Sequence, residues 1–175
     1  MEKTNKLNNF IINLAREAVK EYILEGRRKE EPENLPDQLK KRRGVFVSLK
    51  KNGKLRGCIG TTEPTQENIA QEIISNAISS CSHDPRFVQV QPDEIDNLDI
   101  SVDILGKKEP VSDRNELDPE KYGIIVEGGH QTGLLLPDLE GVDTVKKQIE
   151  IARKKAGLTA EQDIDIYRFQ VTRFE

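Results

Sequence analysis

The side chains best suited to chemistry gather in one short segment, where a cysteine stands between two glycines and two residues after an arginine. The segment is Leu55-Arg56-Gly57-Cys58-Ile59-Gly60. A thiol acts as a nucleophile or redox centre when it is ionised, and a nearby guanidinium favours that form. Glycines at Gly57 and Gly60 would let a ligand approach the backbone. The same pattern also fits a small apolar filler, with both glycines required by close sheet packing or a bulge.

Two further charged side chains, in the segment Asp84-Pro85-Arg86-Phe87, are candidates for the same site. Arg56 could hold a carboxylate or phosphate in a bidentate grip, or it could pair with Asp84 across the fold. Asp84 and Arg86 either form a rigid turn, whose aspartate bonds its own backbone, or face one cleft. If the chain is an enzyme, Cys58 is its nucleophile or redox centre, Arg56 the anion clamp and Asp84 the orienting carboxylate.

The two histidines are weaker candidates. His83 is adjacent to Asp84 and is a weak candidate for a base toward Cys58, because adjacency in sequence does not place three side chains in line. His130 follows a glycine pair and fits a solvated hairpin residue. Together with Cys81 these residues show no paired zinc-knuckle spacing, so the sequence predicts no metal and no cofactor.

The composition fits one globular domain, or one domain with two lobes. The chain has 175 residues, of which 35% are apolar and 33% charged, with a formal net charge of -4. That charge gives no broad positive field for phosphate backbones, which disfavours sequence-independent nucleic-acid binding. The chain begins with polar residues and contains no apolar run of about 18 residues, so we expect no membrane span and a cytoplasmic protein. In a reducing cytosol its two cysteines should remain free thiols.

A β-hairpin is predicted to position the cysteine segment. Residues Gly44 to Lys50 alternate apolar and polar side chains, as in a half-buried strand. Asn52-Gly53 is a preferred two-residue turn, and it leads into a second strand from Lys54 to Ile59.

The register of this hairpin follows if the turn has two residues and no bulge intervenes. Val47 then lies opposite Cys58, and Leu49 lies opposite Arg56. Because side chains alternate between the two faces of a sheet, Arg56 and Cys58 would project from the same face as the valines. We therefore expect the guanidinium and the thiol to be near neighbours.

The other elements follow from hydrophobic periodicity. Helices are predicted after Thr4 and Asn5 up to Gly26, from Gln66 to Cys81 with Cys81 in the core, and from Val142 to Ala156 with Gly157 at its end. Strands are predicted from Leu98 to Ile104, Gly123 to Glu127, Gly133 to Leu136 and Asp163 to Glu175. Arg27 to Arg43 and Gly106 to Glu120 should be connections. Hairpins interrupted by helices indicate an α+β fold with a largely antiparallel sheet.

Three blocks of sequence taken together resemble the AMMECR domain family. They are Gly44-Val45-Phe46-Val47-Ser48-Leu49 with Leu55 to Gly60, then Asp84 to Phe87, then Gly133 to Pro137 with Lys155 to Leu158. The stretch Leu136 to Thr144 is most similar to prokaryotic members called AmmeMemoRadiSam system protein A. The resemblance implies a two-lobed α+β domain over residues 1–175. It also implies a genomic association with a Memo-like, extradiol-dioxygenase-like protein and a radical-SAM enzyme, and some members are fused to the dioxygenase-like domain.

Two functions from different classes are compatible with these residues. The first is binding of a small anionic or carbonyl-bearing ligand, in a cleft floored by Arg56, Gly57 and Cys58 and edged by Asp84 and Arg86. The second is a non-catalytic module that docks through the same surface onto the dioxygenase-like or radical-SAM partner. A third reading gives the cysteine segment a packing role alone. The sequence does not choose among them.

Overall fold

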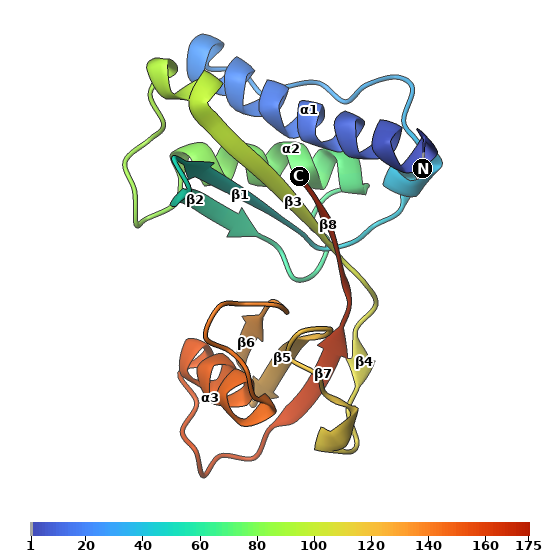
Figure 1. Ribbon diagram of the computed structural model, residues 1–175, viewed down its shortest axis with the longest axis vertical. Helices are drawn as coiled ribbons and strands as arrows, with labels where there is room; N and C mark the ends of the chain where they lie inside the picture. Colours follow the sequence, from blue (N-terminus) through green and yellow to red (C-terminus); the bar gives the residue numbers. More distant parts are fainter. Residues whose placement is uncertain (1) are drawn as a thin grey trace. The chain divides into compact units, whose positions relative to one another are not determined.

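The computed structural model describes residues 2–175, which form two compact units, each with its own sheet and core (Figure 1). Unit 1 comprises the chain up to Ile104 together with Thr172–Glu175, and unit 2 comprises Leu105–Val171. The pairs β1–β2, β1–β3, β4–β7, β5–β6 and β5–β7 are antiparallel, and helices pack against both sheets. The expected α+β class is therefore confirmed.

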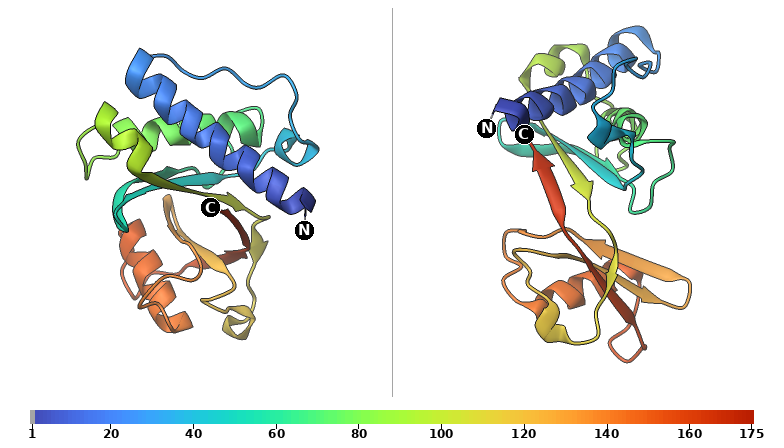
Figure 2. Two further views of the ribbon diagram at one scale, coloured as in Figure 1. Left: turned by 45° about the horizontal axis from the view of Figure 1, so that its top comes forward. Right: turned by 90° about the vertical axis from the view of Figure 1, so that its right-hand side faces the viewer.

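Unit 1 is a four-stranded sheet, in the order β2-β1-β3-β8, with both of its long helices on one face (Figures 1 and 2). Its elements are α1 (Glu2–Glu25), η1 (Asp37–Lys40), β1 (Val45–Lys51), β2 (Lys54–Gly60), α2 (Ile69–Ser82), η2 (Pro92–Asn97), β3 (Leu98–Leu105) and β8 (Val171–Phe174). Strand β2 forms an edge of the sheet. Its outer backbone groups therefore need partners from outside the sheet.

The helices of unit 1 form because each buries an apolar stripe in the common core of this unit. In α1, Ile11 and Ala15 are fully buried, and in α2 the same holds for Ile73 and Ala77. Helix α2 begins three residues later than predicted because Asn68 is its N-cap: the Asn68 side chain accepts a hydrogen bond from the Gln71 amide at 3.0 Å.

The hairpin turn forms as expected. Asn52 and Gly53 have φ angles of 52° and 73°, the left-handed values of the turn that suits twisted strands. Both predicted strands are present on either side of it. Asn-Gly is thus a sufficient local signal for this reversal.

The expected register is wrong, because a β-bulge interrupts the ladder. Leu49 pairs with Gly57 and Lys50 pairs with Leu55, so Arg56 is an extra residue on β2. A two-residue turn fixes the register only as far as the first bulge, and a bulge shifts the pairing of everything beyond it by one residue.

This shift moves Cys58 to the other face of the sheet. Cys58 pairs with Ser48, and Val47 pairs with Ile59. Because Val47 is fully buried under the helices, Cys58 projects from the face that carries no helix of unit 1. The prediction that Cys58 shares a face with the valines is incorrect.

Unit 2 is a second four-stranded sheet, in the order β4-β7-β5-β6, with helix α3 packed on β5 and β6. Its elements are β4 (Glu109–Pro110), η3 (Arg114–Glu116), β5 (Gly123–Gly128), β6 (Gln131–Leu135), α3 (Val145–Ala156) and β7 (Asp165–Phe169). The Thr144 side chain caps α3, which therefore starts at Val145 instead of Val142. Gly157, with φ of 73°, ends this helix as predicted.

The predicted final strand is in fact two strands in different sheets. Strand β7 belongs to unit 2 and β8 to unit 1, and they are separated at Gln170. The Gln170 carbonyl accepts a hydrogen bond from the Gly106 amide at 2.7 Å. Gly106 lies just after the residues where the chain first passes from unit 1 to unit 2. Alternation of apolar and polar side chains continues across Gln170, so periodicity alone gives no sign of the break.

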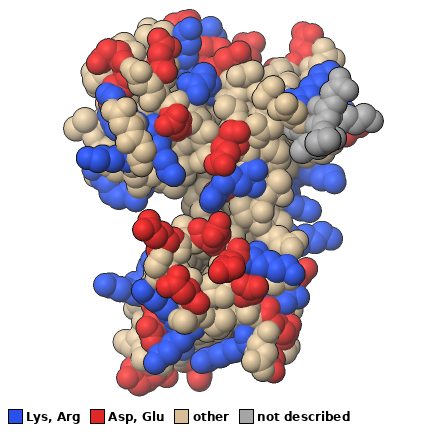
Figure 3. Space-filling model, in the orientation of Figure 1, with Lys and Arg blue, Asp and Glu red and all other residues tan. Residues whose placement is uncertain are grey.

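Side chains of both charges lie on the face of the molecule shown in Figure 3, where they are interspersed. Among the helices described between residues 2 and 175, none combines the length and the apolarity needed to cross a bilayer.

Candidate functional site

Cys58 lies in the edge strand β2, and two side chains take the place of the missing neighbouring strand. The Cys58 amide donates a hydrogen bond to Oδ2 of Asp84 at 2.9 Å. The Cys58 carbonyl accepts one from Nη2 of Arg86 at 3.1 Å. An acceptor and a donor thus close the exposed edge at this residue, and the segment that follows α2 is fixed beside the cysteine.

Asp84 and Arg86 form a tightly bonded ion pair. Oδ1 of Asp84 accepts from the Arg86 amide at 3.1 Å and from its Nε at 2.9 Å, and Oδ2 accepts from its Nη2 at 2.7 Å. The Arg86 side chain holds the pKa of Asp84 far below its usual range, although burial opposes this, and the amides of Cys58 and Arg86 assist. Asp84 thus bonds the local backbone, as the turn interpretation predicted, and also orients Arg86.

The thiol of Cys58 is half-buried and has two polar neighbours. The Ser48 hydroxyl donates to the Cys58 sulfur, with an Oγ to Sγ distance of 3.2 Å. The pKa of Arg86 is raised chiefly by Asp84 and to a smaller extent by Cys58. The guanidinium next to this sulfur is therefore that of Arg86. Side chains Ser48, Cys58, Asp84 and Arg86 are called the thiol site below.

Arg86 retains capacity for a ligand. Its side chain is 54% exposed, whereas its partner Asp84 is almost completely buried. Its Nε and Nη2 serve Asp84 and Cys58, and within residues 2–175 its Nη1 makes no hydrogen bond. One edge of the guanidinium is fixed by the protein, and the side chain remains half-exposed beside a thiol. This arrangement can bind an anion or polarise a carbonyl oxygen.

Arg56 does not belong to this arrangement. Its Nε and Nη2 bind the Glu94 carboxylate at 3.1 and 2.7 Å. Its Nη1 donates to the carbonyl of Val88 at 2.8 Å, and Nη2 also donates to that of Gln89 at 3.3 Å. Every guanidinium nitrogen thus has a partner inside the protein. Arg56 therefore does not pair with Asp84, one of the two alternatives that the sequence left open, and the guanidinium that acts on the Cys58 thiol is that of Arg86.

The Arg56–Glu94 pair instead fixes the loop that carries Phe87 and Val88. Its side chains are only 14% and 12% exposed. Hydrogen bonding to Arg56 lowers the pKa of Glu94 to about 2, against the effect of burial, with smaller contributions from the Gln91 amide and Lys51. A shallow groove of about 490 Å³ lies over this pair, and the Val88 side chain beside it is 80% exposed.

Cys81 is the second free thiol of the chain, and its environment differs from that of Cys58. It is 2% exposed in the core of unit 1, as predicted. Burial raises its pKa to about 11. Cys81 is therefore a core residue, and its burial makes it an internal reference for Cys58.

The structure does not bring His83 to the thiol site. His83 caps the C-terminal end of α2, where its amide donates to the Ser79 carbonyl at 2.8 Å. Its Nδ1 lies 2.6 Å from Oγ of Ser82, and its ring lies 6.4 Å from that of Tyr22. Over the described part of the chain, no three His, Cys, Asp or Glu side chains are grouped to share a metal ion.

The two glycines of the cysteine segment lie where a side chain would not fit. A Cβ at Gly57 would be 2.0 Å from the Ser80 carbonyl oxygen, because α2 packs directly on β2. A Cβ at Gly60 would be 2.2 Å from the ring of Phe46. Packing is a sufficient reason for both glycines.

Two side chains that bind Cys58 and Arg56 escaped the sequence analysis. Ser48 belongs to the conspicuous first strand, but the assumed register placed Val47 opposite the thiol. Glu94 is 38 positions from Arg56, and a lone glutamate in a polar turn carries no local signal of its partner. A search for a residue of opposite charge would have offered Glu94 among many acidic residues.

Comparison with known proteins identifies relatives over almost the whole chain. The AMMECR1 family matches residues 12–174. A Thermotoga maritima protein is 52% identical over 160 residues, which are 90% of this chain and 92% of that protein. A Clostridium acetobutylicum protein is 51% identical over 164 residues, which are 93% of this chain but 35% of that longer protein. The crystal structure of an uncharacterised Pyrococcus horikoshii protein matches with a TM-score of 0.87 and 32% identity, over 94% of this chain and 88% of that one.

Proposed function

This chain belongs to the AMMECR1 family, and on that premise we propose that it binds a small anionic or carbonyl-bearing molecule at the thiol site. One observation carries the proposal. The Cys58 sulfur lies between a donating Ser48 hydroxyl and a guanidinium that is already fixed to the same cysteine's backbone. Groups held in place before a ligand arrives need little reorganisation to bind it.

Each side chain of the thiol site has a distinct role in this proposal. Arg86 contacts the negative or carbonyl oxygen of the ligand through Nη1. Asp84 is a positioning residue, which sets the plane of the guanidinium. Cys58 is the reactive contact: with a carbonyl compound, its sulfur bonds to the carbonyl carbon and the thiol proton passes to the oxygen. The product is a hemithioacetal, whose formation is reversible and requires no other reactant.

The proposed partners are a Memo-like, extradiol-dioxygenase-like protein and a radical-SAM enzyme. The resemblance of the cysteine segment and its companion blocks to the AmmeMemoRadiSam proteins supports this association. In the Clostridium acetobutylicum relative, the matching region is joined to further sequence that makes up most of that protein. Such a joined arrangement supports a domain that works beside a second protein module.

The proposal is tested by the reactivity of the two thiols toward reagents of different charge. The dianionic disulfide reagent DTNB and the neutral N-ethylmaleimide are each reacted with the folded chain, and the labelled cysteine is identified by mass spectrometry. We expect Cys58 to react and Cys81 to stay unlabelled until the protein is denatured. Arg86→Gln should slow the DTNB reaction by about threefold to tenfold relative to N-ethylmaleimide, because it removes a positive charge beside the sulfur.

Matched variants separate this effect from a general loss of charge. Lys147→Gln removes one positive charge from an exposed position on α3 and should leave both rates unchanged. A Cys58 that reacts only after denaturation refutes the proposal. Equal slowing of the two reagents by Arg86→Gln refutes the anion-binding role of Arg86.

A docking module is the second candidate function, and the exposure of Val88 favours it. The backbone of this residue is held by Arg56, so an apolar side chain is presented to solvent on a fixed loop. A fixed apolar side chain beside a groove can serve as an anchor that a protein partner buries. With the purified dioxygenase-like protein as partner, Val88→Asp should abolish binding in calorimetry and Cys58→Ala should not. The ligand-binding function predicts that neither variant changes that affinity.

A further inference from the structure

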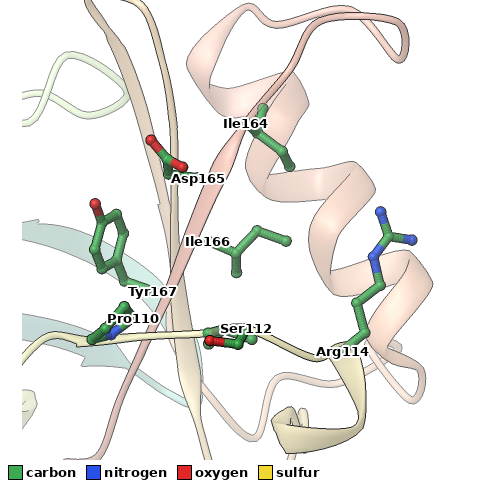
Figure 4. Close-up of a pocket in the computed structure, with 8 residues that line it drawn as sticks. Pro110, Ser112, Arg114, Ile164, Asp165, Ile166 and Tyr167 are labelled. Carbon is green, nitrogen blue, oxygen red and sulfur yellow. The ribbon is translucent and has the colours of Figure 1, made fainter.

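A separate recess lies in unit 2, where β4 and β7 diverge (Figure 4). The Val111 amide donates to the Ile166 carbonyl at 2.9 Å. One residue later the Ser112 amide donates to Oε1 of Glu116 at 3.1 Å, and the chain turns away from β7 into η3. The divergence leaves a recess of about 260 Å³ between the two segments.

One wall of this recess is aliphatic. Ile164 and Ile166 are half-buried, pack against the core of unit 2 and line the recess. In Figure 4 both side chains lie on the same side of β7 as Arg114, whereas the side chains of Tyr167 and Asp165 lie on the other side. The only acidic side chain among the lining residues therefore does not face Arg114.

Arg114 lines the opposite wall of the recess. Across residues 2–175 its side chain has neither a hydrogen bond nor an ion pair, whereas nearby Arg168 is bound by Glu109 at 3.1 Å and by the Glu116 carbonyl at 2.8 Å. The first residue of η3 is Arg114 itself, and this 3-10 turn is capped by the Asp113 side chain. The base of the Arg114 side chain is thus held by ordered backbone beside the aliphatic wall.

We propose that this recess binds a small aliphatic carboxylate, with its hydrocarbon part on Ile164 and Ile166 and its carboxylate on Arg114. A guanidinium matches a carboxylate with two parallel hydrogen bonds, and the neighbouring wall buries the apolar part of the same molecule. The volume lies just below the range of about 300–1,000 Å³ for sites that take drug-sized ligands. The occupant is therefore small, with a short branched chain. This site is independent of the thiol site.

The probe is isocaproate, with isocaproamide as its uncharged counterpart, titrated into the full chain while the isoleucine methyl resonances are followed by NMR. We expect saturable shifts at Ile164 and Ile166, with a dissociation constant on the order of 1 mM for a ligand of this size. Arg114→Gln should raise that constant about fivefold or more, as expected for loss of a partly exposed ion pair. Isocaproamide lacks the charge, so its affinity for the original chain should be no higher than the affinity of isocaproate for Arg114→Gln.

Two further variants and one further ligand sharpen the test. Arg114→Lys keeps the charge without the planar fork and should retain part of the affinity, while Lys147→Gln should retain all of it. N-acetyl-leucine mimics the C-terminal residue of a peptide. If it binds more tightly than isocaproate, the natural ligand is a peptide C-terminus; if isocaproate binds more tightly, the ligand is a free acid. The proposal is overturned if isocaproate causes no saturable shifts, or if Arg114→Gln binds it as tightly as the original chain.

Discussion

Replacing Asp84 with asparagine tests whether this carboxylate organises the thiol site. Its two oxygens each accept two hydrogen bonds: Oδ1 from the amide and Nε of Arg86, and Oδ2 from the Cys58 amide and Nη2 of Arg86. An asparagine side chain offers one oxygen and one amino group, and the amino group cannot accept from any of these donors. Whichever way the amide is oriented, two of the four hydrogen bonds are lost.

The magnitude follows from burial and charge. Hydrogen bonds to a charged group contribute about 1.5–3 kcal/mol each. Asp84 is 4% exposed, but the Arg86 side chain is 54% exposed. Water can therefore replace part of the hydrogen bonding that the Arg86 guanidinium loses in the variant. We therefore expect Asp84→Asn to lower the free energy of unfolding by about 2–3 kcal/mol at neutral pH.

The pH dependence of this loss has a defined sign. The folded pKa of Asp84 lies well below its unfolded value of about 3.9, so its contribution to stability is complete above about pH 4 and is lost as the pH falls below that. Urea unfolding of both proteins, followed by circular dichroism from pH 7 down to pH 3, should therefore show the difference shrinking below about pH 4. Asparagine itself does not titrate in this range.

Two results would refute this reasoning. One is a loss below about 0.5 kcal/mol at neutral pH, the size expected of an ordinary surface substitution. The other is a loss that stays constant down to pH 3. Asp99→Asn is the matched control, because Asp99 is an exposed aspartate on β3 of the same sheet, and it should change stability by less than about 0.5 kcal/mol.

Two other substitutions test the packing and the ion pair around the same hairpin. Gly57→Ala should lower the free energy of unfolding, measured by thermal unfolding, by about 2–4 kcal/mol, because its methyl group meets the Ser80 carbonyl oxygen. Its control is Gly53→Ala, at φ of 73° with nothing within 4 Å, which should lower the same free energy by about 1 kcal/mol. Equal losses would contradict the close packing of α2. Glu94→Gln should lower the free energy of unfolding by about 2–3 kcal/mol at neutral pH, because Arg56 loses part of its ion pair. Since the pKa of Glu94 is lowered to about 2, the difference in stability between the two proteins in urea unfolding should fade as the pH drops from about 4.3 toward 2.

Features encoded by neighbouring residues could be predicted from the sequence. The Asn52-Gly53 turn, the left-handed Gly157 and the apolar stripes of α1 and α2 each depend on a few adjacent side chains, and all are present. The α+β class follows from their order. The break at Gln170 could not be predicted, because it depends on which sheet the strand joins and not on its alternation.

The composition of the candidate site was predicted better than its geometry. Cys58, Asp84 and Arg86 do come together, although Cys58 and Asp84 are 26 positions apart. The placement of Arg56 failed because of one inserted residue in the ladder. Since side chains alternate with a period of two, an error of one position exchanges the two faces of a strand and with them every neighbour of the thiol.

That single bulge also explains why the two arginines have different partners. Arg56, as the extra residue, is freed from the regular ladder and turns to Glu94 and the loop carbonyls of Val88 and Gln89. The loop fixed in this way begins with Asp84 and Arg86, the pair that closes the edge of β2 at Cys58. Arg56 therefore holds the loop that carries Arg86, and we expect its effect on the thiol site to be indirect. Arg56→Gln should therefore slow DTNB labelling of Cys58 less than Arg86→Gln does, because it affects the thiol only by loosening this loop.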